Sequence, residues 1–171
     1  MRLLFRLLIV LVAAAGILAA ALFGLTRQYT VRGTLMEPTL KSGDHVAVFR
    51  FSDWFYTPHR KDVVVFSKAP TPGCGTSHRY VERVIGLPGE TVSERTGRVS
   101  IDGKPLKEPY IKAGQRDTRT AAWRVPPGSY FVMGDNRNTS CDSRVWGSVP
   151  KKDIIGKVFL TFWPVDRVSI D

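Results

Sequence analysis

An uncharged run of 19 residues, Leu7–Leu25, is the feature that most constrains how this chain can fold. It consists mainly of Leu, Ala, Val and Ile, and as a helix it would be about 28 Å long, close to the hydrocarbon thickness of a bilayer. A cleavable secretory signal, with Ala19 or Ala21 near its exit site, is the rival interpretation, but the apolar region of such signals is typically shorter. We therefore predict a retained membrane anchor over residues 1–28.

Positive charge is spread along the whole chain, and the formal net charge is +10. Arg2 and Arg6 before the apolar run balance Arg27 and Arg32 after it, so charge does not fix the orientation of the anchor. The sequence has no run of five like charges and no zinc-finger or RNA-binding motif. These features argue against nucleic acid as a partner, and beside an anchor they favour membrane lipid.

The rest of the chain, residues 29–171, has the pattern of an all-β domain. Brief apolar runs rich in β-branched residues predict strands at six places: His45–Phe49, Val63–Phe66, Tyr80–Ile85, Arg98–Ile101, Tyr130–Met133 and Val158–Phe162. No helical periodicity extends over a dozen residues outside the apolar run. We predict long loops at residues 70–77 and 104–123 and a small insert or lobe over residues 92–128. The predicted fold class is mainly β.

Two cysteines, Cys74 and Cys141, are the only ones in the chain and lie 67 positions apart. A zinc site needs clustered ligands, so we expect neither a metal nor a cofactor. Outside the cytoplasm the two thiols could pair, but the sequence leaves this open, because it does not give their separation in space.

Four segments follow the apolar run in a recognisable order. They are Met36–Leu40 with Gly43 and Asp44 after it, Lys61–Phe66, Tyr80–Glu90, and Met133–Arg144 with Trp146 and Gly147 after it. Together they resemble the signature of type I signal peptidases, which remove signal peptides from exported preproteins. The resemblance implies a coiled antiparallel β-sheet domain behind one transmembrane helix, on the extracytoplasmic side of the cell membrane.

The chain departs from this family at the residues that carry its chemistry. Members hydrolyse a peptide bond with a serine whose proton is taken by a neutral, buried lysine. By resemblance, Leu35 stands at the serine position and Glu82 at the lysine position. Gly33 stands where a hydroxyl would help to stabilise the oxyanion. A hydrocarbon side chain cannot attack a carbonyl group, so the resemblance predicts a signal-peptidase-like protein without the catalytic dyad.

The residues that support the dyad in the family are largely retained. By resemblance they are Met36, Pro38, Tyr80, Arg83, Asp135, Ser140, Asp142 and Arg144. We expect Arg83 to pair with Asp135 and Asp142 with Arg144, because such pairs hold loops whether or not catalysis survives. Ser140, which would orient the lysine amine, is expected to hydrogen-bond Glu82 instead.

A signal peptide would lie extended between two strands, 29–34 and 79–82, adding its backbone to the sheet. The resemblance assigns this role to Thr30, Val31, Arg32 and Val81. The leading hypothesis is therefore a membrane pseudoenzyme that binds signal peptides, or an active peptidase paralogue, without cutting.

Two other hypotheses stay open from sequence. An active peptidase could use Thr34 as its nucleophile, although the side chain of a neighbour in an extended segment faces away. A purely structural membrane subunit could retain only the fold. We expect the three histidines, His45, His59 and His78, to be structural or exposed.

Overall fold

A computed structural model describes residues 11–13, 16, 24, 26–50, 56–69 and 71–170 of the protein. Among these residues no helix is both long and apolar enough to cross a membrane. Residues 11–13, 16 and 24 are helical, but most of the predicted anchor lies outside the described residues. The first strand begins at Thr26, so the predicted boundary after residue 28 falls inside a strand.

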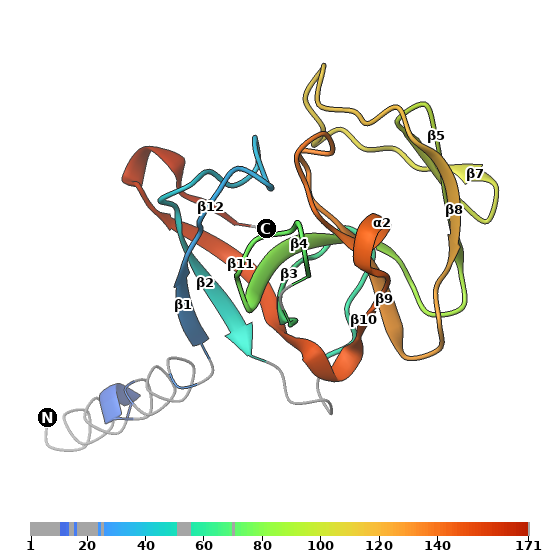
Figure 1. Cartoon of the computed structure of the whole chain (residues 1–171). Coiled ribbons are helices and arrows are strands. Elements are labelled where there is room, and N and C mark those ends of the chain that lie inside the picture. Colours follow the sequence, from blue (N-terminus) through green and yellow to red (C-terminus); the bar gives the residue numbers. More distant parts are fainter. Residues whose placement is uncertain are drawn as a thin grey trace, which may run out of the picture.

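The larger sheet is antiparallel and carries the candidate site (Figure 1). Its strands run in the order β1-β2-β11-β3-β4-β9-β10, with β12 paired to β11. Their bounds are Thr26–Thr30 (β1), His45–Arg50 (β2), Val63–Ser67 (β3), Arg79–Gly86 (β4), Ser129–Met133 (β9), Val149–Pro150 (β10), Ile154–Trp163 (β11) and Ser169–Ile170 (β12). The prediction of a mainly β fold is confirmed.

A second antiparallel sheet lies at the right of Figure 1, in the order β7-β6-β5-β8. Its strands are Thr91–Arg95 (β5), Arg98–Ile101 (β6), Lys104–Pro105 (β7) and Thr120–Arg124 (β8). The expectation of one long loop over residues 104–123 was wrong, because β7 and β8 occupy its two ends. The remaining elements are short: Ser143–Trp146 (α2), Lys151–Asp153 (η1) and Val165–Arg167 (η2).

Strand β3 shows why the larger sheet must be covered on both faces. Val63 and Val65 pack with Met36 and Leu40 on one face, in a cluster that also includes Val31. Val64 and Phe66, which alternate with them, pack on the other face. A continuous apolar run is the pattern expected of a strand buried on both sides. The segment that follows β1 therefore folds back over the sheet and approaches β4.

A disulfide joins Cys74 to Cys141, whose Cα atoms are 5.5 Å apart. It links the loop between β3 and β4 to the loop that follows β9. The bridge closes a long segment, and the loop-closure entropy that it removes from the unfolded chain stabilises the fold.

Removing this bridge should destabilise the protein strongly. For a separation of 67 residues, the chain-entropy argument gives roughly 4 kcal/mol. We expect the Cys74→Ser/Cys141→Ser double variant to lose about 2–4 kcal/mol of unfolding free energy in urea titrations. The unaltered protein under a reductant should match it. Equal stability of the oxidised and reduced forms would contradict the prediction.

Candidate functional site

A turn between β1 and β2 carries the nucleophile position. Leu35 lies in this turn and is half-buried, and its side chain lines a groove. The backbone N–H of Asn136 donates to the Leu35 carbonyl at 2.9 Å, and the Asn136 amide Nδ2 donates to the Thr34 carbonyl at 3.2 Å. The loop after β9 therefore fixes the backbone of the turn. We expected Leu35 to follow directly on an extended strand over residues 29–34. That strand ends at Thr30, and Leu35 lies in a turn instead.

Strand β4 carries the base position. Glu82 pairs across from Val64 and is completely buried. Within the described part of the chain, neither of its carboxyl oxygens has a hydrogen-bond partner. Burial raises the pKa of Glu82 well above its ordinary value, and the negative charge of Asp142 raises it further, while Arg144 acts in the opposite direction. Burial therefore favours the protonated, neutral form of this side chain.

The two positions converge on Gly134. Strands β4 and β9 are antiparallel, and Arg83 pairs with Met133. The residue before Arg83, Glu82, therefore lies beside the residue after Met133, Gly134. A Cβ atom at Gly134 would clash with the Ser140 hydroxyl and lie 2.6 Å from the Leu35 carbonyl oxygen. Glycine at this position thus allows close approach of the turn, β4 and the Ser140 loop.

Ser140 is buried here, but its hydroxyl makes no hydrogen bond to any described residue. The expectation that Ser140 would bond Glu82 was wrong. A buried hydroxyl and a buried carboxyl without partners are both unfavourable, since each has lost its hydration. Among the described residues neither group has a hydrogen-bond partner, so both keep unmet hydrogen-bonding capacity.

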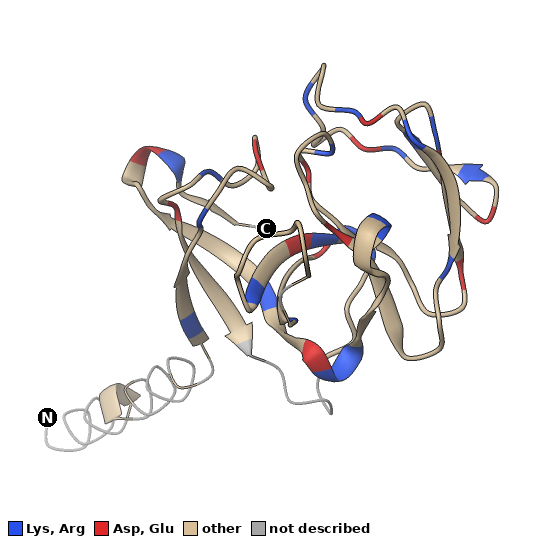
Figure 2. Ribbon diagram, viewed as in Figure 1, with Lys and Arg blue, Asp and Glu red and all other residues tan. Residues whose placement is uncertain are grey.

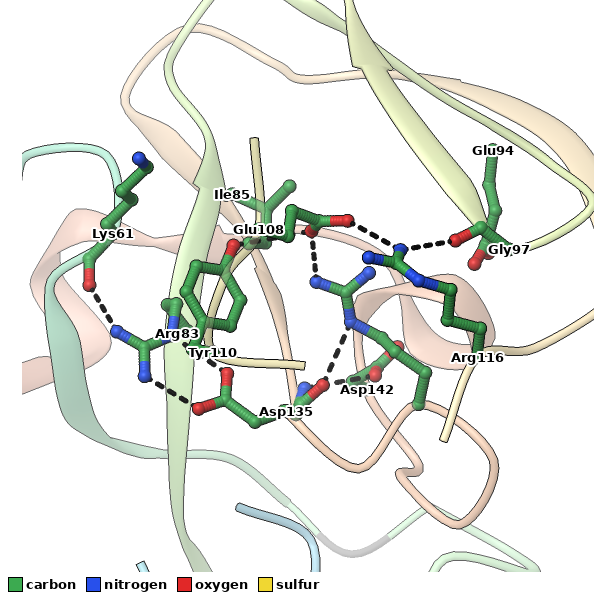
Figure 3. Close-up of polar contacts among 12 residues, drawn as sticks. Lys61, Arg83, Ile85, Glu94, Gly97, Glu108, Tyr110, Arg116, Asp135 and Asp142 are labelled. Carbon is green, nitrogen blue, oxygen red and sulfur yellow. Dashed lines mark hydrogen bonds and ion pairs between the residues drawn. The ribbon is translucent and has the colours of Figure 1, made fainter. Parts of the chain in front are cut away.

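Arg83 and Asp135 form the expected ion pair in a bidentate geometry (Figure 3). The Arg83 Nε and Nη2 atoms donate to the two Asp135 carboxylate oxygens at 2.8 and 2.6 Å. The Thr39 hydroxyl also donates to Asp135, at 2.5 Å. The guanidinium lies 4.1 Å from the Tyr110 ring centroid, a favourable cation–π position.

Breaking this pair should be severe, because the remaining charge would stay buried without compensation. We expect Asp135→Ala to lower the free energy of unfolding by about 3–5 kcal/mol. Arg119→Ala is the control, since it removes the half-exposed Arg119–Asp117 pair and should cost less than about 1 kcal/mol. Urea denaturation followed by tryptophan fluorescence measures both. Similar losses in the two variants would contradict the prediction.

Asp142 and Arg144 form the second expected pair. Arg144 donates through Nε and Nη2 to the two Asp142 oxygens, each at 2.8 Å. Asp142 also accepts from the Gly134 backbone at 3.2 Å and caps the first turn of α2 through the Arg144 N–H. One carboxylate thus ties the loop after β9 to α2, a structural role that does not depend on catalysis.

A buried ionic cluster between the two sheets was not predicted (Figure 3). Arg137, fully buried, donates to Glu108 at 2.5 Å and to the Gly134 carbonyl at 3.0 Å. Arg116 donates to Glu108 at 3.3 Å, and Arg144 reaches Glu94 at 3.7 Å. Arg137 lies within the fourth recognised segment, but nothing in the sequence around Glu94 or Glu108 marks them as buried partners.

An open groove of about 170 Å³ runs between the turn and the start of β4. All four residues predicted to contact a peptide line it: Thr30, Val31, Arg32 and Val81. Gly33 and Leu35 lie at the same groove. Val46, Val65 and Met36 supply apolar lining, so the groove suits small apolar side chains.

The remaining predicted residues have structural positions. Met36 is buried in the core, and Tyr80 stacks on Phe66 with a centroid separation of 5.8 Å. Pro38 follows a cis peptide bond in the turn and is exposed. Met36 and Pro38 thus have structural roles in the turn, and Tyr80 has one in β4.

The groove brings no basic catalytic group to Leu35. The described residues that line it include no lysine and no histidine. His45 packs edge-on against Phe162, and His59 and His78 are exposed, as expected for structural or surface histidines. Thr34 is exposed and is absent from the groove lining.

Known proteins are similar to this chain in sequence and in fold. The family model described as "Signal peptidase, peptidase S26" matches residues 4–163. Signal peptidase I of Leptolyngbya laminosa is 44% identical over 139 residues, which cover 78% of this chain and 67% of that protein. Signal peptidase I V of Bacillus subtilis (strain 168) is 38% identical over 144 residues, or 76% of this chain and 82% of that protein. A crystal structure of a signal peptidase I from Enterococcus faecalis V583 matches with a TM-score of 0.50 and 33% identity, over 60% of this chain and 97% of that one. The chain therefore belongs to the signal peptidase family, peptidase S26.

Proposed function

We propose that this chain is a non-hydrolytic member of its family that binds signal peptides of exported preproteins without cutting them. One observation carries the proposal: a leucine occupies the nucleophile position and a fully buried glutamic acid occupies the base position. Leu35 has no atom that can form an acyl intermediate. Glu82 lacks the amine that serves as the base in a Ser/Lys dyad. Residue 35 also has no hydroxyl that a base could activate.

The neighbouring groups do not supply a substitute. The Ser77 hydroxyl, which lies at the groove, donates to the Arg79 carbonyl at 2.6 Å. The sulfur of Cys74 is held in the disulfide. The lack of lysine and histidine in the groove lining leaves a threonine or serine there without a base.

Retained backbone edges support peptide binding. Strand β4 pairs with β9 only from Arg83 onward, so the edge of Arg79–Glu82 away from β3 has no strand beside it among the described residues. An extended peptide can add its backbone to such an edge while its side chains enter the groove. Leu35 occupies part of the groove wall and leaves space beside it.

The disulfide supports an extracytoplasmic place for the β domain, because such bridges persist in oxidising compartments. We propose that the apolar run before β1 anchors the chain in the cell membrane, with the β domain outside the cytoplasm.

Photo-crosslinking to a signal peptide tests the proposal. The full chain should crosslink to the peptide and release no cleavage product. Val81→Trp, which fills the groove, should reduce the crosslink at least tenfold. The matched control is Val145→Trp, at an exposed position on α2, and it should crosslink normally. A crosslink that Val81→Trp leaves unchanged would contradict groove binding, and no crosslink at all would favour a structural membrane subunit.

A further inference from the structure

The charged side chains that line the groove are all positive among the described residues. Arg32 and Arg79 are its basic lining residues, and among the described residues no acidic side chain lines it. Both arginines are exposed, and neither forms an ion pair with a described carboxylate. Arg79 lies 5.8 Å from the Tyr29 ring centroid, which holds its guanidinium beside the groove.

The two arginines come from the two walls of the groove, Arg32 from the segment after β1 and Arg79 from the start of β4. Arg32 lies three residues before Leu35, and Arg79 lies three residues before Glu82. A peptide lying in the groove would therefore pass both arginines.

Positive charge continues beyond the groove. Arg79 also lines two shallow depressions, one shared with Arg27 and the other with Lys68 and His78. Asp153 is the single acidic residue that the described part of the chain contributes to the lining of either. Figure 2 shows bands of Lys and Arg on β1 and at one end of β4. We call Arg27, Arg32 and Arg79 the arginine rim.

We infer that the arginine rim selects extended peptides that carry carboxylates just outside the segment held in the groove. The inference rests on the proposed peptide binding and adds a charge preference to it. Acidic side chains placed over the rim would meet unpaired guanidinium groups, while lysines there would be repelled. Each exposed pair contributes little, so the preference depends on two or three acting together.

The test compares peptides with one apolar core and Asp-Asp, Asn-Asn or Lys-Lys at either end. Affinity for the unaltered full chain is measured by fluorescence anisotropy at low and high salt. When the pair stands at the end of the peptide that reaches the arginine rim, the Asp-Asp peptide should bind about tenfold more tightly than the Asn-Asn peptide. The Lys-Lys peptide should bind more weakly than both. The difference should shrink at high salt, because these charges are exposed.

Two variants assign the preference to the rim. Arg32→Gln/Arg79→Gln should bind Asp-Asp and Asn-Asn peptides equally. Arg98→Gln, an exposed arginine on β6, controls for net charge and should keep the preference.

The outcomes separate this inference from the proposed function. Equal affinity for all three peptides would overturn the charge preference and leave peptide binding intact. Binding of no peptide would overturn both. If the double variant lost affinity for vesicles of phosphatidylglycerol and phosphatidylcholine but kept its preference among peptides, the rim would be a lipid surface and the inference would be wrong.

Discussion

The double variant Leu35→Ser/Glu82→Lys is expected to cleave a preprotein, whereas neither single variant should do so. A serine beside a neutral glutamic acid has no base to take its proton, and a lysine beside a leucine has no nucleophile to activate. The two residues act as a unit, so their effects should be strongly non-additive. We expect the double variant to exceed either single variant by about 10³-fold or more in cleavage rate.

The surroundings of Glu82 favour this gain. A lysine at a fully buried position has its pKa lowered by desolvation, which supplies the neutral amine that the reaction needs. The unpaired Ser140 hydroxyl offers this amine a hydrogen-bond partner. The backbone of residue 35 is already held by Asn136.

The matched control is Leu35→Ala/Glu82→Lys, which places the same amine in the site without a nucleophile. Cleavage of a fluorogenic preprotein peptide measures all variants. Activity in this control would show that the serine is not the nucleophile. An inactive but folded Ser/Lys variant would point to Gly33, because a missing oxyanion donor alone lowers the rate by about 10²–10³-fold.

Replacing Glu82 with methionine is expected to stabilise the protein, by an amount that grows with pH. The folded state keeps the Glu82 proton, since burial raises its pKa, while the unfolded chain releases it above about 4.5. The folded state therefore binds more protons, and the free energy of unfolding of the unaltered protein must fall as pH rises above that value. The free energy of unfolding falls until the pH reaches the raised pKa of Glu82 in the folded state. The slope is at most about 1.4 kcal/mol per pH unit.

Methionine has a similar volume and no proton to release, so Glu82→Met should remove this part of the pH dependence. Urea denaturation between pH 4.5 and 8 gives the two stability curves, which should diverge with rising pH. Asp166→Asn removes an exposed carboxylate and should give a curve parallel to that of the unaltered protein. If the Glu82→Met curve were also parallel, Glu82 would not be the source of the dependence.

The strands that were predicted from sequence are those whose side chains are mostly apolar. β3 is the clearest example, because burial on both faces requires an unbroken run such as Val63–Phe66. β5 was missed, since Glu94 stands at a buried position where alternation would require an apolar residue. The carboxyl group of Glu94 is buried near Arg144, a contact 50 positions away that local patterns do not reveal.

The contacts of the candidate site could be predicted where both residues lie in the four segments that resemble the family signature. Contacts to residues outside those segments could not. Both pairs, Arg83–Asp135 and Asp142–Arg144, join residues inside those segments, and both were expected. The Arg137–Glu108 pair joins such a segment to the second sheet, so only the folded chain reveals it. The pairing of Cys74 with Cys141 likewise depended on a distance in space.

Incubation of the unaltered full chain with a preprotein in detergent, followed by mass spectrometry, tests the central claim most directly. We expect no cleavage above the rate in buffer and no covalent acyl adduct on any residue. Steady cleavage that disappears on Thr34→Val, or an adduct on any side chain, would contradict the account.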